Sequence, residues 1–349
     1  MKYKAFAALL IMLMLVAVTT GYTQTMRKNG VSGASILKVG VGAKAVALGS
    51  AVTTGAGDVN QLFWNPAGIS MERGKTQVTF SYNNWLADLN HNAFAVAHCF
   101  GNLGTFALGG MMAGVGDIAA DRDYVADLDI DYSGGSTFDY NSMYLALGYA
   151  KQFTDKLSLG ATAKYYREEI DVESVSTFAF DFGAIYKIGY RDLTIGARIQ
   201  NLGQDMKYYF TDFSLPLVFS FGVSMSMIKS DFFSLKGFAD ATKPLDAEQL
   251  LLGGLEVSLY KNIHVRTGYK FNYTGVRDEF EDRVSYQRIE DETRSHWWNP
   301  EEHYRTDEGL SVGAGIEIPY GDYELVVDYS WTSFRLLDDV NRFSFTIKF

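Results

Sequence analysis

The most constraining feature of this sequence is an alternation of apolar and polar side chains with a period of two, which begins near residue 76 and continues to the C-terminus. Such a period is that of a strand with two different faces. It is clearest in the last nine residues, Asn341 to Phe349, where every second side chain is aromatic or aliphatic. We therefore expect strands of roughly ten residues. The fold class that follows is all-β, with the last nine residues as the closing strand.

The lengths of the connections decide between a soluble sandwich and a membrane barrel. Every second connection between the predicted strands is tight, such as Thr154-Asp155 and Lys261-Asn262. Most of the connections that alternate with these are longer, including 115–141 and 274–308. Short turns on one side, long loops on the other and an even strand number are typical of bacterial outer-membrane barrels. Fourteen strands are predicted, at 76–86, 91–100, 104–114, 142–153, 156–168, 175–187, 192–201, 215–228, 231–241, 249–260, 263–273, 309–319, 322–333 and 340–349.

Composition agrees with a transmembrane antiparallel β-barrel over residues 76–349. The chain has 34 Gly and 24 Phe but only 5 Pro, which favours strands and tight turns over helices. Its formal net charge of -10 argues against a nucleic-acid partner, because phosphate binding needs clustered Lys and Arg. A single cysteine, Cys99, excludes an intrachain disulfide.

The N-terminus has the three regions of a secretory signal. Lys2 and Lys4 precede an apolar run over residues 5–18, and small or polar residues follow at 19–21. We expect residues 1–21 to be a signal peptide and the bacterial outer membrane to be the location. The protein is then in contact with outer-membrane lipid and lipopolysaccharide.

Glycines in the middle of the predicted strands indicate that something fills the barrel. A glycine weakens a strand, so its recurrence on the inward face suggests that space is needed there. The segment over residues 22–75 is too short for a separate domain, and we expect it to be a hatch or plug in the lumen. The inward glycines are Gly148, Gly160, Gly183, Gly196, Gly222, Gly268 and Gly313.

Two strings in this N-terminal segment, residues 42–49 and 62–69, carry a resemblance to a known family. The second contains an Asn-Pro-Ala-Gly element at Asn65, Pro66, Ala67 and Gly68. The pattern resembles the hatch of the long-chain fatty-acid transporter (FadL) superfamily of fourteen-stranded outer-membrane barrels.

A second string, Asn84 to Leu89, resembles more specifically the PorV/PorQ branch of that superfamily, some members of which serve type IX protein secretion. The residues that match this branch are Trp85, Leu86, Ala87 and Asp88.

The Asn-Pro-Ala-Gly element predicts a rigid turn, because proline fixes φ and asparagine can bond its own backbone. The turn either leads the plug into the first strand or acts as a gate in the lumen. Gly109 and Gly110 are adjacent glycines in the third strand, where a strand can kink. The resemblance implies a lateral exit at such a kink, and clearance for the plug explains the same glycines equally well.

Acidic residues are concentrated in two of the long loops, 115–141 and 274–308. Loop 115–141 has seven aspartates against one arginine. Within it, Asp127, Asp129 and Asp131 alternate in a way that could hold a weakly bound calcium ion, although no glutamate closes a twelve-residue calcium loop. The alternative is a solvated acidic face, bridged to lipopolysaccharide by divalent cations. No other cofactor is expected.

The sequence supports two functions, neither of them enzymatic, since its five histidines accompany no recognisable catalytic set. As a PorV/PorQ-like protein, the barrel would deliver secreted proteins to the surface, with those proteins or secretion-system components as partners. As a FadL-like transporter, it would pass a hydrophobic small molecule through the hatch and a lateral opening. The Trp85 string favours export, and the scarcity of apolar residues predicted on the lumen face also counts modestly against a greasy channel.

Overall fold

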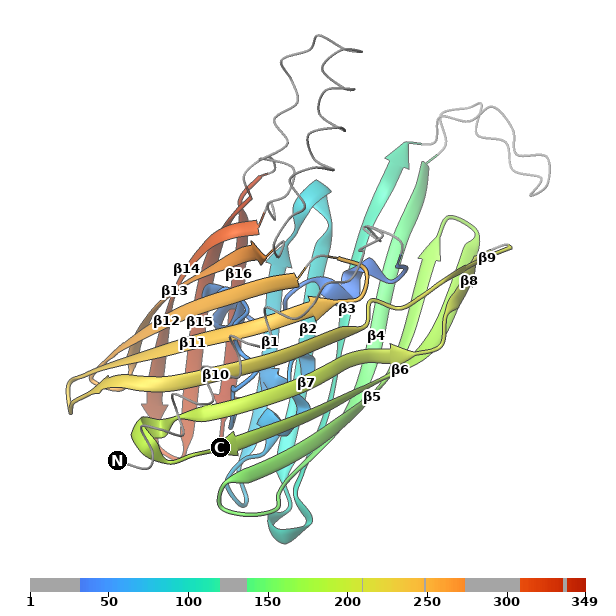
Figure 1. The fold of residues 1–349 in the computed structure, drawn as a ribbon. Helices are drawn as coiled ribbons and strands as arrows, with labels where there is room; N and C mark the ends of the chain where they lie inside the picture. Colours follow the sequence, from blue (N-terminus) through green and yellow to red (C-terminus); the bar gives the residue numbers. More distant parts are fainter. Residues whose placement is uncertain (1–31, 120–136, 209, 248, 274–307, 335–337) are drawn as a thin grey trace, which may run out of the picture.

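The computed structural model describes residues 32–119, 137–208, 210–247, 249–273, 308–334 and 338–349. Fourteen antiparallel strands form a closed barrel (Figure 1). The strands are β1 (Thr76–Asn84), β2 (Asn90–Cys99), β3 (Thr105–Ala119), β4 (Thr137–Gln152), β5 (Leu157–Ile170), β6 (Glu173–Lys187), β7 (Thr194–Gly203), β10 (Val218–Lys229), β11 (Phe233–Pro244), β12 (Gln249–Leu259), β13 (Ile263–Tyr273), β14 (Glu308–Tyr320), β15 (Tyr323–Phe334) and β16 (Val340–Lys348). The fourteen predicted barrel strands are confirmed.

Closure occurs between the first and last barrel strands. β1 pairs with β16 from Gln77 opposite Lys348 to Asn84 opposite Asn341. Beyond the strand end, the nitrogen of Thr76 donates to the carbonyl of Phe349 at 2.7 Å. The C-terminal residues therefore close the barrel, at the end where the tight turns lie.

Two loops differ from the prediction. β3 and β4 extend into the expected loop 115–141, because their pairing resumes at Ile118 after a register shift that begins at Val115. The connection from β7 to β10 holds a hairpin of β8 (Met206–Tyr208) and β9 (Thr211–Phe213), which lies at the right in Figure 1. The alternation missed this hairpin because each of its strands has only three residues.

The two faces of the wall differ as the alternation predicts. On β16, the outward side chains of Phe343 and Phe345 are 41% and 45% exposed, whereas the inward Arg342 is 1% exposed. Large apolar side chains cover the outside of the other barrel strands in the same way. Such an apolar outer face meets lipid, and the protein is an outer-membrane barrel.

The helices are all short. Among the residues described, none is long and apolar enough to cross a membrane, a finding that bears on helices alone. They include η1 (Ser35–Lys38), α2 (Ala43–Ala47), η2 (Val59–Phe63), η3 (Pro66–Ile69), η4 (Leu86–Asp88), η5 (Gly101–Leu103) and η7 (Tyr190–Asp192).

Residues 32–75, here called the N-terminal segment, carry the first four of these helices and lie inside the barrel (Figure 1, blue). α2 contacts β13 to β16, and η3 contacts β4, β5 and β6. Most of the segment is buried, including Val46, Leu62 and Asn65 at 0% exposure. The predicted signal peptide, residues 1–21, and the first part of the predicted hatch lie outside the described residues.

Candidate functional site

The inward glycines of the wall make room for the N-terminal segment. A Cβ atom on Gly160 would lie 2.4 Å from the carbonyl carbon of Pro66, and one on Gly268 would lie 2.0 Å from the nitrogen of Gly49. Each of the seven glycines picked out from the sequence faces this segment at such short range. No other residue fits these positions without moving the segment, which explains why the strands tolerate glycine there.

The Asn-Pro-Ala-Gly element forms the predicted turn. Asn65 caps η3, with its Oδ1 accepting a hydrogen bond of 3.1 Å from the nitrogen of Ala67. Its Nδ2 donates to the carbonyl of Thr53 at 2.6 Å, and so joins two parts of the N-terminal segment. A Cβ on Gly68 would lie 2.2 Å from the carbonyl oxygen of Gly55. The turn is therefore packed on all sides between the segment and the wall.

Hydrogen bonds attach the N-terminal segment to the part of the wall that extends from β1 and β16 around to β6. The nitrogen of Ala43 donates to Ser344 Oγ on β16 at 2.8 Å. Gln200 Nε2 on β7 donates to the carbonyl of Phe63 at 3.0 Å. Further bonds reach β1, β6 and β11. This polar side holds the segment in register with the barrel.

The part of the wall made by β2, β3 and β4 is different. The inward side chains of β2, β3 and β4 are mainly alanine, and within the described chain no hydrogen bond joins them to residues 32–69. Leu62, Phe63 and Ile69 of the N-terminal segment pack there by apolar contact alone. We call this contact the apolar seam. Its wall residues are Ala93, Ala95, Ala97, Ala107, Met111, Ala113, Tyr144, Ala146 and Ala150.

Several charged side chains in the lumen form ion pairs with one another. Arg266 lies 2.6 Å from Glu256 and 2.5 Å from Asp328. Lys164 lies 2.6 Å from Asp181 and donates to Asn201 Oδ1 at 3.0 Å. Arg266 and Lys164 are therefore neutralised, whereas the buried Arg198 and Arg342 lie against the rings of Trp64 and Trp85.

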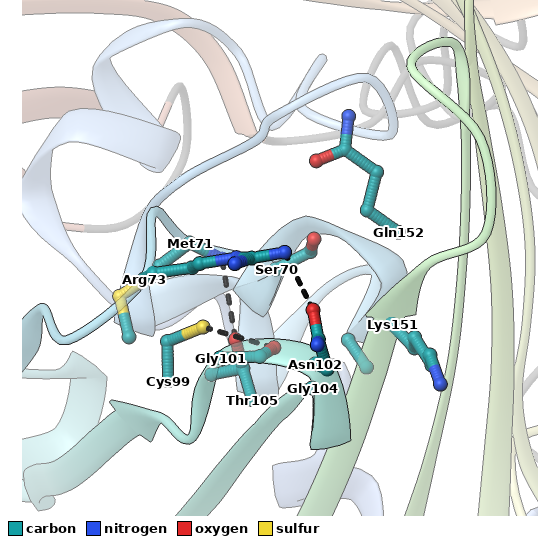
Figure 2. A pocket seen from close by; sticks show the side chains of 11 residues that line it. Ser70, Met71, Arg73, Cys99, Gly101, Asn102, Gly104, Thr105, Lys151 and Gln152 are labelled. Carbon is teal, nitrogen blue, oxygen red and sulfur yellow. Dashed lines mark hydrogen bonds between the residues drawn. The ribbon is translucent and has the colours of Figure 1, made fainter.

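A cavity of about 180 Å³ lies at the periplasmic end of the apolar seam (Figure 2). Met71 and Ala150 line the cavity and also belong to, or pack against, the seam cluster. Two hydrogen bonds join residues that line it: the nitrogen of Met71 donates to Thr105 Oγ1 at 3.3 Å, and Arg73 Nη2 donates to Asn102 Oδ1 at 2.5 Å. The remaining lining residues are Ser70, Cys99, Gly101, Gly104, Lys151 and Gln152.

At the opposite, outer mouth, two connections of the barrel hold the start of the N-terminal segment. Asp246, between β11 and β12, accepts hydrogen bonds from Ser32 and, at 2.8 Å, from Lys38. The carbonyl of Ser214, after β9, accepts from the nitrogen of Gly33 at 3.0 Å. The segment is thus fixed at the mouth as well as along the wall.

The hairpin of β8 and β9 is fixed to the wall by a cluster that the sequence did not reveal. Glu168 on β5 accepts hydrogen bonds from the hydroxyls of Tyr140, Tyr166 and Tyr208. Tyr208 belongs to β8, so this carboxylate joins the hairpin to β4 and β5. Nothing in the spacing of these residues along the chain indicates that they meet.

The Trp85 string forms the turn between β1 and β2. Ala87 and Asp88 have positive φ angles of 56° and 58°. The ring of Trp85 packs edge-on against Phe334 with centroids 5.3 Å apart, and the guanidinium of Arg342 lies 4.9 Å from its centroid. The string therefore shapes the outer mouth beside the lumen.

Gly109 and Gly110 lie in a continuous part of β3. Gly109 pairs with Ala95 on one side and Ala146 on the other, without a register shift. A Cβ on Gly109 would lie 2.8 Å from Leu62, so this glycine gives clearance to the N-terminal segment. The lateral opening implied by the resemblance stays a prediction.

The proposed calcium ligands Asp127, Asp129 and Asp131 lie outside the described residues. In the part of the chain that the structure covers, no group of three or more His, Cys, Asp or Glu side chains is placed to hold a metal ion.

The apolar seam was missed in the sequence, although a signal for it exists. Ala93, Ala95 and Ala97 alternate with larger residues such as Phe94 and Val96. A strand with small side chains on one face leaves space for a neighbour to pack closely. Because alanine is apolar as well as small, the alternation of apolar and polar residues does not by itself distinguish this face from one with large side chains.

Comparison with known proteins finds similarity in structure only. No sequence family matches the chain, and no curated protein matches its sequence. A solved structure of the Pseudomonas putida toluene transporter TodX matches with a TM-score of 0.52 and 9% identity, covering 87% of this chain and 96% of that one.

Two further solved structures match over similar lengths. The CymD monoaromatic hydrocarbon channel gives a TM-score of 0.54 with 11% identity, covering 89% of this chain and 97% of that one. A Pseudomonas aeruginosa FadL homologue gives 0.51 with 12% identity, covering 89% and 98%. The chain therefore has the fold of the FadL-type outer-membrane barrels.

Proposed function

We propose that this protein is a passive channel that carries hydrophobic small molecules across the outer membrane. The observation that carries the proposal is the apolar seam, which runs through an otherwise polar lumen. The seam provides an apolar path through the lumen, although the sequence predicted few apolar residues on the lumen face. Two proteins of the same fold are named as a toluene transporter and a monoaromatic hydrocarbon channel, which supports the same function here.

The seam is closed by packed apolar side chains, and opening it has a low free-energy cost. Leu62, Phe63 and Ile69 touch the wall only through side chains, so rotating them away breaks no hydrogen bond to β2, β3 or β4. An incoming apolar molecule restores the lost contacts, because dispersion and burial do not depend on direction. Meanwhile the hydrogen bonds on the polar side keep the backbone of the N-terminal segment in place.

The seam leads toward the periplasmic cavity of Figure 2. Since β3 stays paired with both neighbours at Gly109 and Gly110, a molecule that follows the seam reaches this cavity without parting the wall. Met71 and Thr105 share one long hydrogen bond across it. We therefore place the exit beneath residues 70–73, and a lateral exit through β3 is the competing route.

Uptake of a radiolabelled hydrocarbon tests the proposal. Cells that lack their own hydrocarbon channel would be compared with and without the protein, using toluene as the probe. Uptake above the empty-vector level is expected, and uptake equal to that level would overturn the channel function. Native purification with mass spectrometry adds a check, since a co-purifying secreted protein with no bound hydrocarbon would favour protein export instead.

A blocking variant distinguishes the two exits. Ser70 lines the periplasmic cavity and is half-buried, so Ser70→Trp fills the cavity, whereas Ser70→Ala leaves it open. A disulfide between Val96→Cys and Leu108→Cys, which pair on the lipid face in a Cys99→Ser background, would instead hold β2 to β3. Inhibition by Ser70→Trp alone supports the periplasmic exit, and inhibition by the disulfide alone supports the lateral one.

A further inference from the structure

The wall residues of the apolar seam on β2, β3 and β4 are alanines, except for Met111 and Tyr144, while the large inward His91 of β2 lies outside this cluster. Met111 on β3 is 1% exposed and Tyr144 on β4 is 4% exposed, and the two stand directly opposite each other in the strand pairing. Their inward neighbours on the same strands are Gly109, Ala113, Ser142 and Ala146. Among the wall residues of the apolar seam, the two large side chains therefore stand at the same level.

The N-terminal segment places a third large side chain in the same cluster. Phe63 packs against Tyr144 edge to face, with ring centroids 6.3 Å apart and an interplanar angle of 66°. The backbone of Phe63 is held in place because its carbonyl accepts the hydrogen bond from Gln200, whereas its side chain makes no hydrogen bond. Tyr144 thus contacts Phe63 and stands opposite Met111 in one buried cluster, and we call these three residues the constriction.

From this arrangement we infer that Phe63, Met111 and Tyr144 are the specificity-determining constriction of the channel, and that they select uncharged molecules with the cross-section of a single aromatic ring. This inference rests on the proposed function and deepens it. A flat ring can take the place of Phe63 or Tyr144 in their edge-to-face contact, because offset and edge-on aromatic pairs are both favourable. A fused multi-ring molecule has to displace all three side chains.

The charge beside the constriction supports an uncharged ligand. The Nζ atom of Lys164 lies 5.5 Å from the Tyr144 ring centroid, but it is buried and already held by Asp181 and Asn201. A carboxylate arriving at Tyr144 would have to compete with Asp181 for this ammonium group. Desolvating an anion without a free partner is costly, so the constriction disfavours acids.

The test compares uptake of toluene and phenanthrene in cells that carry each variant. Tyr144→Ala and Met111→Ala widen the constriction. Each should raise the ratio of phenanthrene uptake to toluene uptake by about tenfold, which is the lower end of the range by which apolar pockets discriminate between ligands of different size. Tyr144→Phe keeps the ring and should keep the wild-type ratio.

Leu145→Ala and Met112→Ala are matched controls. Both change the adjacent residue of the same strand, and both face lipid, at 48% and 60% exposure. The migration of unheated samples in SDS gels shows whether each barrel has folded. Met111→Phe narrows the seam instead of widening it, and should lower toluene uptake even if the alanine variants fold poorly.

The outcomes separate the two proposals. An unchanged uptake ratio in folded Tyr144→Ala and Met111→Ala, with normal toluene uptake by the wild type, overturns the constriction and leaves the channel function standing. If the wild type carries neither probe above the empty vector, the channel function fails, and the constriction fails with it. Benzoate, a charged single-ring probe, should enter no faster than in cells without the protein, and rapid entry would contradict selection for uncharged ligands.

Discussion

The main-chain nitrogen of Thr53 donates a hydrogen bond of 2.9 Å to the carboxylate of Asp240, and this contact ties the N-terminal segment to β11. Asp240 is 3% exposed, so water does not replace the bond readily. We expect Asp240→Ala to destabilise the packed segment by about 1.5–3 kcal/mol, the usual range for a hydrogen bond to a charged group. Limited proteolysis of the purified barrel measures this as faster cleavage within residues 32–75.

Asp231→Ala is the control for that change, because Asp231 is an exposed aspartate in the turn between β10 and β11. It should leave the cleavage rate as in the wild type. Equal rates for Asp240→Ala and the wild type would show that β11 does not hold the segment.

Gly183→Ala should disturb the Asn65 turn by steric overlap. The new Cβ would lie 1.8 Å from Asn65 Oδ1, so the cap of η3 has to move. Overpacking of this kind costs about 1–3 kcal/mol. The check is the temperature at which the barrel loses its fast migration in SDS gels, which should fall. Gly309→Ala is a matched control, since the nearest neighbour of its Cβ would be 3.7 Å away. The temperature at which this variant loses its fast migration should equal that of the wild type.

Asn65→Ala and Asn65→Asp should separate the two roles of this side chain. The alanine variant loses both the bond from Ala67 and the bond to Thr53, whereas aspartate keeps an acceptor for Ala67 and loses the donor. Loss of an N-cap alone costs about 1 kcal/mol. We expect aspartate to be no better than alanine, because it places a buried charge against the Thr53 carbonyl. Full recovery of thermal stability by aspartate would contradict this view of the Thr53 contact.

The outer end of the N-terminal segment should loosen in acid. Burial by itself would raise the pKa of Asp246, but hydrogen bonds from Lys38 and Ser32 outweigh burial and hold the pKa below its ordinary value of 3.8. A lowered folded-state pKa stabilises the contact above the ordinary pKa, and this stabilisation is lost as the pH falls through the lowered value. The contact should therefore persist at neutral pH and weaken below about pH 4.

A spin label reports this transition. Ser35 is exposed in η1, so Ser35→Cys in a Cys99→Ser background accepts a label without disturbing the contact. Its mobility should rise as the pH falls below about 4. In Asp246→Asn the label should be mobile at every pH, and a label that stays immobile in that variant would exclude Asp246 as the holding group.

The sequence by itself determined the barrel. Alternation with a period of two places one set of side chains against lipid and the other in the lumen, and this is a local property that each strand carries in its own residues, as in Phe343 and Phe345 against Ser344. The segregation of turn lengths then fixed the topology. The inward glycines also indicated a filled lumen, because a strand keeps glycine where a neighbour approaches closely.

Only the tertiary structure decided which part of the wall is polar and which is apolar toward the N-terminal segment. Phe63 and Tyr144 are 81 positions apart in the chain, and no spacing rule brings them together. Their contact depends on how deep the segment sits and how it is rotated, which the hydrogen bonds of Ala43, Thr53 and Phe63 to distant strands set jointly. Such long-range contacts arise when the barrel closes around the segment, and so the apolar seam, unlike the strands, could not be read from local pattern.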